Sequence, residues 1–248
     1  MPRLSASIVL YKTPQAILNR VLPCLLATEA EKIWLIDHSP EAFALPTLPH
    51  DHRIIYRKYP NRGYGAGNNI AMRESLKEGF TYHLVLNPDT YWEPGTVEQL
   101  LDYMDSEPTV AHTMPKVLYP DGSFQFQAKP LPHIRDFLFG RIGLGGKRLE
   151  EYKQKSQKQD TPVDAPFLSG CFMLLRNSAL AQVGLFDERY FMYCEDLDLT
   201  RRLSQNYRTV YYPLVEIRHN LNRESARSPR LFFHHLMSAI RYIVKWHI

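Results

Sequence analysis

Strand-like apolar segments alternate with helix-like segments through the first half of this 248-residue chain, and the alternation limits the folds open to it. The strand-like segments are 5–11, 32–37, 53–59 and 82–86. The helix-like segments, in which apolar residues recur at helical spacing, are 14–26, 70–77 and 94–104. Such alternation favours a parallel sheet with right-handed crossovers and helices on its faces. The predicted fold class is therefore α/β, with a mostly parallel Rossmann-like sheet.

The second half has a less regular pattern. Its predicted strands are 109–119 and 123–127 around a Pro-Asp-Gly turn, 167–175 with an interruption at Ser169-Gly170, 209–212, and 215–219. These favour a small antiparallel second sheet. Residues 140–160 are rich in glycine and then in charge, which predicts an exposed loop or helix. A helix is predicted over 231–246, with Phe232, Leu236, Ile240 and Val244 in one row that we expect to dock on the domain. Without a repeat or a dividing linker, the chain is predicted to form one domain over 1–248.

Three polar motifs follow predicted strands at the edge where parallel sheets bind ligands. They are Asp37-His38-Ser39, the glycine-rich stretch 61–69, and Asn87-Pro88-Asp89. The glycines would let backbone approach a nucleotide closely, although a tight strand-to-helix turn also explains one or two of them. Asp89 could hold a hard divalent cation together with His219, yet Asp89 alone fits a turn and His219 alone fits a surface or a core.

The stretch Tyr193–Leu199 places Glu195, Asp196 and Asp198 directly after an aromatic run and at the start of a predicted helix. Helix capping would explain one acid in a first turn. Three acids beside apolar side chains are better explained by a carboxylate whose pKa is raised, as a general base requires. Asp198 is spaced to pair with Arg201 or Arg202, which would stabilise the helix.

Composition sets outer limits on function. Hydrophobic residues are 44% and charged residues 23%, which is ordinary for a globular protein, and no run reaches the length of a membrane span. The start of the chain has no signal-peptide pattern, and three cysteines without metal-like spacing indicate reduced thiols, so we expect a cytoplasmic protein. Basic residues dominate from Arg201 onward, which fits either phosphates of a nucleotide or membrane, or a solvated face.

An ordered series of motifs resembles the family 2 glycosyltransferases of the GT-A fold, most closely bacterial rhamnosyltransferases of cell-surface polysaccharide (O-antigen or capsule type) synthesis. The resemblance extends from about Ser5 to Trp246. The motifs that carry it are Ile36-Asp37-His38-Ser39, Asn61-Arg62-Gly63-Tyr64-Gly65-Ala66-Gly67-Asn68, Leu86-Asn87-Pro88-Asp89-Thr90, Ser169-Gly170-Cys171, Gly184-Leu185-Phe186-Asp187-Glu188, and Phe191–Leu199, followed by His219. The chain departs from the common pattern where Asn87 replaces the first acid of Asp-x-Asp and where His38 replaces an asparagine.

The resemblance implies a role for each matching position. Residues 1–106 would form a nucleotide-binding half, and 107–248 an acceptor and catalytic half. The residues implied to contact the nucleotide sugar are Asp37, Asn61, Gly63, Gly65, Gly67, Asn68, Asn87, Asp89, Gly170 and Arg227, with Arg223 as an alternative to Arg227. Asp89 and His219 would hold Mg²⁺ or Mn²⁺ as the cofactor. Asp196 would be the catalytic base, supported by Glu195.

The implied activity is inverting transfer of a sugar, with dTDP-L-rhamnose as the expected donor, to a hydroxyl of a glycan or lipid-linked acceptor. Nucleic acid is not an expected partner, whereas peripheral contact with the inner membrane face is. Three alternatives stay open at this point: a transferase of the same fold that uses another UDP, GDP or dTDP sugar, a nucleotidyltransferase, and a non-catalytic carbohydrate-binding module. The second is disfavoured because Tyr11-Lys12-Thr13-Pro14 stands where a glycine-rich basic loop belongs.

Overall fold

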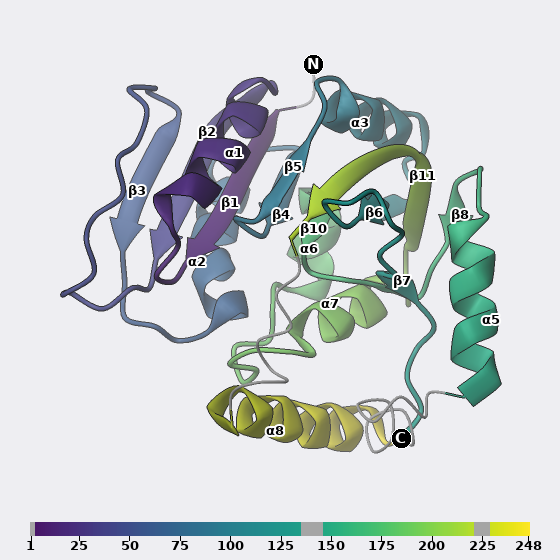
Figure 1. Ribbon diagram of the computed structural model, residues 1–248. Helices are drawn as coiled ribbons and strands as arrows, with labels where there is room; N and C mark the ends of the chain where they lie inside the picture. Colours follow the sequence, from purple (N-terminus) through teal and green to yellow (C-terminus); the bar gives the residue numbers. More distant parts are fainter. Residues whose placement is uncertain (1–2, 135–145, 221–228) are drawn as a thin grey trace.

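The computed structural model describes residues 3–134, 146–220 and 229–248 as a layered α/β structure (Figure 1). Its main sheet has nine strands in the order β3-β2-β1-β4-β10-β6-β11-β5, with β8 paired to β11. The strands of this sheet are β1 (Leu4–Leu10), β2 (Ala30–Asp37), β3 (Ile54–Lys58), β4 (Tyr82–Leu86), β5 (Thr90–Trp92), β6 (Val110–Leu118), β8 (Val163–Asp164), β10 (Phe172–Arg176) and β11 (Arg208–His219).

The predicted parallel sheet is confirmed in the first half, where β3, β2, β1 and β4 run side by side in the same direction. Their residues are almost all buried in β1, β2 and β4, as expected of parallel strands covered on both faces. The second half extends the sheet through β10, which is antiparallel to both β4 and β6. The small antiparallel second sheet is also present, formed by β7 (Ala128–Lys129) and β9 (Phe167–Leu168).

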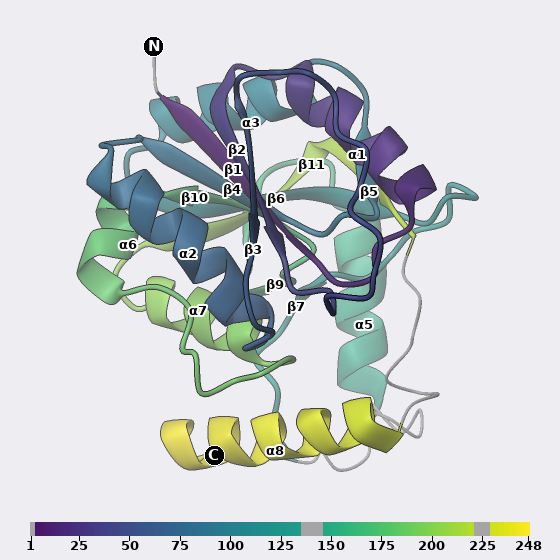
Figure 2. The same ribbon diagram turned by 90° about the vertical axis from the view of Figure 1, so that its left-hand side faces the viewer.

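Helices cover both faces of the main sheet (Figure 2). They are α1 (Gln15–Leu26), α2 (Tyr64–Lys77), α3 (Thr96–Ser106), α5 (Gly146–Gln157), α6 (Asn177–Val183), α7 (Glu195–Leu203) and α8 (Pro229–Trp246). Side chains of α1 and α3 pack into the largest apolar cluster on one face. Met72 of α2, Leu180 of α6 and Leu199 of α7 share a cluster on the other face. No helix among the described residues is long and apolar enough to cross a membrane.

Several predicted boundaries were wrong. The glycine-rich stretch 61–69 was expected to be a loop before a helix from Ile70, but α2 already begins at Tyr64. The segment 123–127 makes only an isolated bridge between Leu118 and Phe124 instead of a strand. The two predicted strands 209–212 and 215–219 form one strand, β11, whose register shifts between Tyr212 and Glu216. Of the segment 140–160, the described part contains α5, in agreement with the helical alternative.

The C-terminal helix α8 is held by a buried carboxylate at the first turn of α7. Asp198 is fully buried and accepts hydrogen bonds from Arg202 Nε, Lys245 Nζ and Trp246 Nε1, each at 2.9 Å. The predicted pairing of Asp198 with an arginine one turn later is thereby confirmed for Arg202. Lys245 also contacts Asp187 at 2.8 Å. Asp198 is thus a structural anchor that joins α7 to α8.

Asp198→Asn should lower the free energy of unfolding by about 3 kcal/mol, because it leaves the partly buried Arg202 without its counter-charge and removes one of the two carboxylates that hold Lys245. The matched control is Glu107→Gln, which removes an exposed carboxylate from an ion pair with Arg208 and should cost less than about 1 kcal/mol. Chemical denaturation of both variants measures the difference. Equal losses would contradict the anchoring role of Asp198.

Candidate active site

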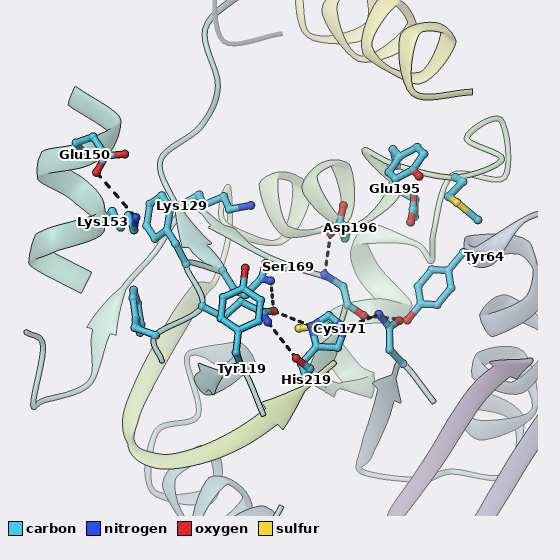
Figure 3. Close-up of a pocket in the computed structure, with 18 residues that line it drawn as sticks. Tyr64, Tyr119, Lys129, Glu150, Lys153, Ser169, Cys171, Glu195, Asp196 and His219 are labelled. Carbon is cyan, nitrogen blue, oxygen red and sulfur yellow. Dashed lines mark hydrogen bonds and ion pairs between the residues drawn. The ribbon is translucent and has the colours of Figure 1, made fainter. Parts of the chain in front are cut away.

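A cavity of about 870 Å³ lies between the start of α7, the loop before β10 and the end of β11. Figure 3 shows Glu195 and Tyr64 on one side of it, Lys129 and Lys153 on the other, and His219 between them in that view. A volume of this size is within the range of ligand sites. The predicted residues that line it are Asn87, Gly170, Glu195, Asp196 and His219.

Backbone strain positions the acidic residues at this cavity. Tyr193 and Cys194 both have left-handed conformations, with φ of 69° and 65°, directly before α7 begins at Glu195. Consecutive non-glycine residues in this region are costly and persist only where surrounding contacts fix them. The turn directs the side chains of Glu195 and Asp196 to the cavity wall while the rest of α7 packs on the sheet.

Asp196 is oriented by two backbone donors. Its Oδ2 accepts a hydrogen bond from Gly170 N–H at 2.7 Å, and its Oδ1 accepts one from Leu197 N–H at 2.8 Å. A Cβ on Gly170 would stand 3.0 Å from the Asp196 Cβ, so a glycine permits this close approach. Burial raises the pKa of Asp196, and the two N–H donors and Lys129 partly offset the rise. Each carboxylate oxygen keeps a second lone pair for a substrate proton.

Glu195 is more deeply buried than Asp196, with 6% of its surface exposed. Its Oε2 has no hydrogen-bond partner in the described part of the chain. Burial, and secondarily the charge of Asp196, raise the pKa of Glu195 well above its ordinary value. The two neighbouring acids therefore occupy different environments, one with backbone donors and one without.

On another part of the cavity wall, His219 stands beside Asp89. The distance from His219 Nε2 to Asp89 Oδ1 is 3.3 Å, and Asn87 Nδ2 also lies 3.3 Å from Nε2. On the other side of the ring, His219 Nδ1 lies 2.7 Å from Gln125 Oε1. Burial lowers the pKa of His219, but Cys171 and Asp89 outweigh it and raise the pKa to about 10.

These residues fit a divalent cation that also binds a ligand. Gln125 Oε1 accepts a hydrogen bond from the Nδ1–H of His219. Nε2 is thereby directed at the Asp89 carboxylate, as in histidine ligands oriented by a second hydrogen bond. Among residues 3–134, 146–220 and 229–248, no group of three or more His, Cys, Asp or Glu side chains could hold a metal alone. Mg²⁺ and similar ions accept one or two protein ligands when phosphates and waters supply the others.

A second cavity of about 430 Å³ borders the ends of β2 and β3. Its lining includes His38, Ser39, Asn61 and Phe191, whereas Met192 and Tyr193 line the first cavity, so the aromatic run separates the two. Asp37 is buried behind Ser39 and does not line either space. Its Oδ1 accepts the Ser39 N–H at 2.7 Å, and its Oδ2 accepts the Tyr56 hydroxyl at 2.6 Å.

The glycine-rich stretch has a packing role that its sequence did not disclose. Gly63 has φ of 102°, and a Cβ there would lie 2.1 Å from the Phe191 carbonyl oxygen. Gly65 packs on Phe186 and near Glu195, and Gly67 packs on Val9 and His38. Each glycine therefore lets α2 approach a neighbouring segment. Direct contact between these glycines and a nucleotide stays a prediction.

Asn68 lines neither of these two cavities. It is fully buried, accepts a hydrogen bond from Ser7 Oγ and donates one to the Tyr64 carbonyl. Asn61 accepts the Gly63 N–H at 3.0 Å and remains at the second cavity. Arg227 and Arg223 lie outside the described residues. Arg201 and Arg202, which belong to the same basic end, contact Tyr242 and Asp198 instead of a cavity.

Sequence reasoning missed several residues of the cavity wall. They include Tyr64, Gln125, Gln127, Lys129 and Lys153. Tyr64 donates its hydroxyl to the Gly170 carbonyl at 2.9 Å, so the same peptide segment is held from both sides. Gln125 and Gln127 stand two positions apart in a segment predicted to be extended, a spacing that places both side chains on one face. That spacing is the sequence signal from which Gln125 and Gln127 could have been predicted to share a surface.

Comparison with known proteins identifies the family. The family model described as glycosyl transferase family 2 matches residues 6–184. The chain belongs to glycosyl transferase family 2. It is 37% identical over 158 residues to N-acetylglucosaminyl-diphospho-decaprenol L-rhamnosyltransferase of Mycobacterium tuberculosis, covering 61% of this chain and 52% of that protein. It is 30% identical over 228 residues to rhamnosyltransferase WbbL of Escherichia coli K12, covering 88% and 83%. The chain thus spans about half the length of the mycobacterial relative.

Solved structures agree on the fold of this family 2 member. GalNAc-T7, crystallised with UDP, GalNAc and Mn²⁺, superposes with a TM-score of 0.64 at 15% identity, over 88% of this chain and 43% of that one. Mannosyltransferase PcManGT of Pyrobaculum calidifontis, in complex with GDP-Man and Mn²⁺, gives 0.58 at 14% identity, over 97% and 64%. The recognition of the family and of its fold from sequence motifs is therefore confirmed.

Replacement of Glu195 should stabilise the protein at neutral and higher pH. Because the folded-state pKa is raised, stability falls as the pH rises above the unfolded value of about 4.3, where only the unfolded state loses the proton, and the loss is complete above the folded-state pKa. Glu195→Gln should therefore raise the thermal midpoint near pH 8, by about 2–4 °C for each kcal/mol recovered, and change it little near pH 4.

The control is Glu93→Gln on an exposed glutamate, which should show no such dependence on pH. Thermal unfolding of both variants across this pH range is the measurement. A lower midpoint for Glu195→Gln near pH 8 would show that the carboxylate has a stabilising partner.

Proposed function

We propose that the chain is an inverting glycosyltransferase that moves L-rhamnose from dTDP-L-rhamnose to a hydroxyl of a glycan or lipid-linked acceptor. The observation that carries the proposal is one cavity lined both by Glu195 and Asp196 and by Asn87 and His219, with Asp89 in contact with His219. The two acids suit proton removal from an acceptor, and Asp89 with His219 suits a diphosphate with its cation.

The two cavities support a division of labour within the chain. Residues 1–106 would bind the nucleotide, with its base in the second cavity against His38, Ser39 and Asn61. Asp37 would support this site from behind by holding Ser39. Residues 107–248 would bind the acceptor and contribute the catalytic carboxylates. The sugar would then lie in the first cavity, beside the aromatic side chain of Tyr193.

In the proposed reaction, Asp196 accepts the proton of the acceptor hydroxyl as the hydroxyl oxygen attacks the anomeric carbon. The bond from that carbon to the diphosphate oxygen breaks, and the nucleoside diphosphate leaves with the bonding electron pair. One displacement inverts the configuration. Asp196 suits this role because Gly170 and Leu197 fix its orientation and burial raises its pKa. Glu195, which lines the same cavity, would lie next to this base.

Asp89 and His219 would hold Mg²⁺ or Mn²⁺, with Asn87 beside them. The bound cation would offset the negative charge that develops on the leaving diphosphate. Gln125 would keep His219 in the orientation that presents Nε2.

The names of the relatives support the choice of sugar and acceptor. Both the mycobacterial and the Escherichia coli relatives are rhamnosyltransferases, and the former is named for a diphospho-decaprenol-linked sugar. A lipid-linked acceptor in cell-surface polysaccharide synthesis is therefore the proposed one, and the cytoplasm is the proposed location. The best-supported alternative is another sugar nucleotide, since the solved structures of this fold were obtained with UDP and GDP-Man.

A panel of sugar nucleotides tests the donor. We expect dTDP-L-rhamnose to raise the thermal midpoint in the presence of Mn²⁺ or Mg²⁺, and to raise it less when the cation is removed by a chelator. Transfer from the same donor to an acceptor should be detectable by mass spectrometry. Transfer from UDP or GDP sugars alone would contradict the donor assignment while leaving the site intact.

Asp196→Asn should reduce turnover on the order of 10²–10⁴-fold, because the amide cannot accept the acceptor's proton. Donor binding, measured by the same thermal shift, should be retained because the proposed nucleotide contacts lie elsewhere. The control is Asp102→Asn on the exposed side of α3, which should keep normal turnover. Near-normal turnover of Asp196→Asn, combined with loss of turnover in Glu195→Gln, would assign the base to Glu195.

A further inference from the structure

The side of α8 that faces away from the domain is apolar along its length. It exposes Phe232, Phe233, Leu236, Ile240 and Val244, with exposed fractions of 42%, 58%, 44%, 45% and 66%, and we call this set the outer face. Figures 1 and 2 both show α8 as the lowest element of the molecule, below α7. The row expected to dock on the domain is therefore the row that stays outside.

A different side of α8 makes the docking contacts. Ala239 and Tyr242 are buried there, and Ser238 Oγ donates to the Met192 carbonyl at 2.8 Å. Lys245 and Trp246 reach Asp198, as described above. With both polar and apolar contacts on the inner side, α8 cannot roll to bury its outer face without breaking them.

The outer face is unusual for a solvated surface. Of the ten large apolar side chains that are exposed among the described residues, five lie on this single helix. Scattered exposed apolar residues are ordinary, but a contiguous group indicates a surface that another phase or molecule covers.

Charge identifies what would cover it. The sequence of α8 contains no aspartate or glutamate, whereas it contains Arg230, Arg241 and Lys245. Arg241 is exposed and donates to the carbonyl of Arg189, whose side chain is also largely exposed. Arg189 and Lys245 pair with Asp187, and Arg241 adds a positive charge without an acidic partner on its own helix. An apolar face on a helix that carries basic residues and no acidic ones matches helices that lie in the interface of anionic membranes. A second copy of the chain is a less suitable partner, because pairing two outer faces would bring the basic residues of two α8 helices close together.

The position of α8 connects this face to the active site. His234 stacks on Phe191 with ring centroids 4.3 Å apart, and His235 contacts the ring of Tyr193. Met192 and Tyr193 line the large cavity, and Phe191 lines the second one. The inner side of α8 thus rests directly on the wall between the two cavities.

We propose that the outer face of α8 binds the interface of an anionic lipid bilayer and holds the cavity beside the headgroup layer. The binding is peripheral, with the apolar side chains inserted below the headgroups and Arg241 beside them. The consequence for catalysis, delivery of a lipid-linked acceptor to Asp196, rests on the proposed function. Membrane binding itself does not.

The test is co-sedimentation of the full chain with vesicles of phosphatidylglycerol and phosphatidylcholine, or of phosphatidylcholine alone, without donor or acceptor. We expect binding to the anionic vesicles that weakens with salt. The variant Phe233→Ser/Ile240→Ser/Val244→Ser should bind at least about tenfold more weakly, because it lacks three apolar side chains that the bilayer would bury. The control Leu45→Ser/Leu214→Ser removes exposed leucines elsewhere and should bind like the parent. Circular dichroism and the thermal midpoint check folding, and Val244→Asp alone replaces the triple variant if that does not fold.

Absence of binding to anionic vesicles, or equal binding by the parent and a folded outer-face variant, would overturn the proposal. Sedimentation velocity provides the other decisive outcome: a dimeric parent and a monomeric variant would assign the face to a second copy.

Transfer to a short-chain, water-soluble acceptor should be the same in parent and variant. Loss of all transfer in both, with vesicle binding retained, would contradict the proposed function and leave the membrane surface standing.

Discussion

The burial of two adjacent carboxylates, Glu195 and Asp196, is the constraint on which the candidate site depends. Placing a carboxylate in apolar surroundings is costly unless hydrogen bonds or cations compensate it. Asp196 obtains such compensation from Gly170 and Leu197, whereas Glu195 Oε2 obtains none in the described structure. The free-energy cost of burial therefore falls mainly on Glu195, and the packing of the rest of the domain offsets it. Such a loss of stability is common at sites that serve activity.

The neighbouring segments are shaped around this pair. The absence of side chains at Gly63, Gly65 and Gly170 lets the start of α2 and the loop before β10 close on the aromatic run and on α7. Asp198, one turn into α7, then fixes that helix to α8 through Lys245 and Trp246. Acids two or three positions apart thus serve different purposes, since two face the cavity and one is an internal anchor.

Much of this organisation could be predicted from the sequence because it is local. The alternation of segments gave the parallel half of the sheet, and the spacing of Asp198 and Arg202 gave their ion pair. The start of α2 was missed because glycines at 63, 65 and 67 disfavour a helix by intrinsic propensity, and tertiary packing overrides that preference. The support of His219 by Gln125 joins positions 94 residues apart and has no local signal.

The orientation of α8 also could not be predicted from the sequence. The row Phe232, Leu236, Ile240 and Val244 has the spacing of a docking face, and spacing alone favoured its burial. Which side of an apolar helix docks is decided instead by specific partners, here Asp198 and the Met192 carbonyl. The family could be recognised from ordered motifs, while the assignment of each motif residue to the cavity wall or to its support needed the structure.

The most direct test of the account is anomalous diffraction from crystals of the protein with Mn²⁺ and a thymidine diphosphate. We expect a manganese peak within coordination distance of Asp89 Oδ1 and His219 Nε2 and in contact with the diphosphate, with the base in the cavity lined by His38, Ser39 and Asn61. A nucleotide ordered elsewhere, or a manganese peak away from both Asp89 and His219, would contradict it.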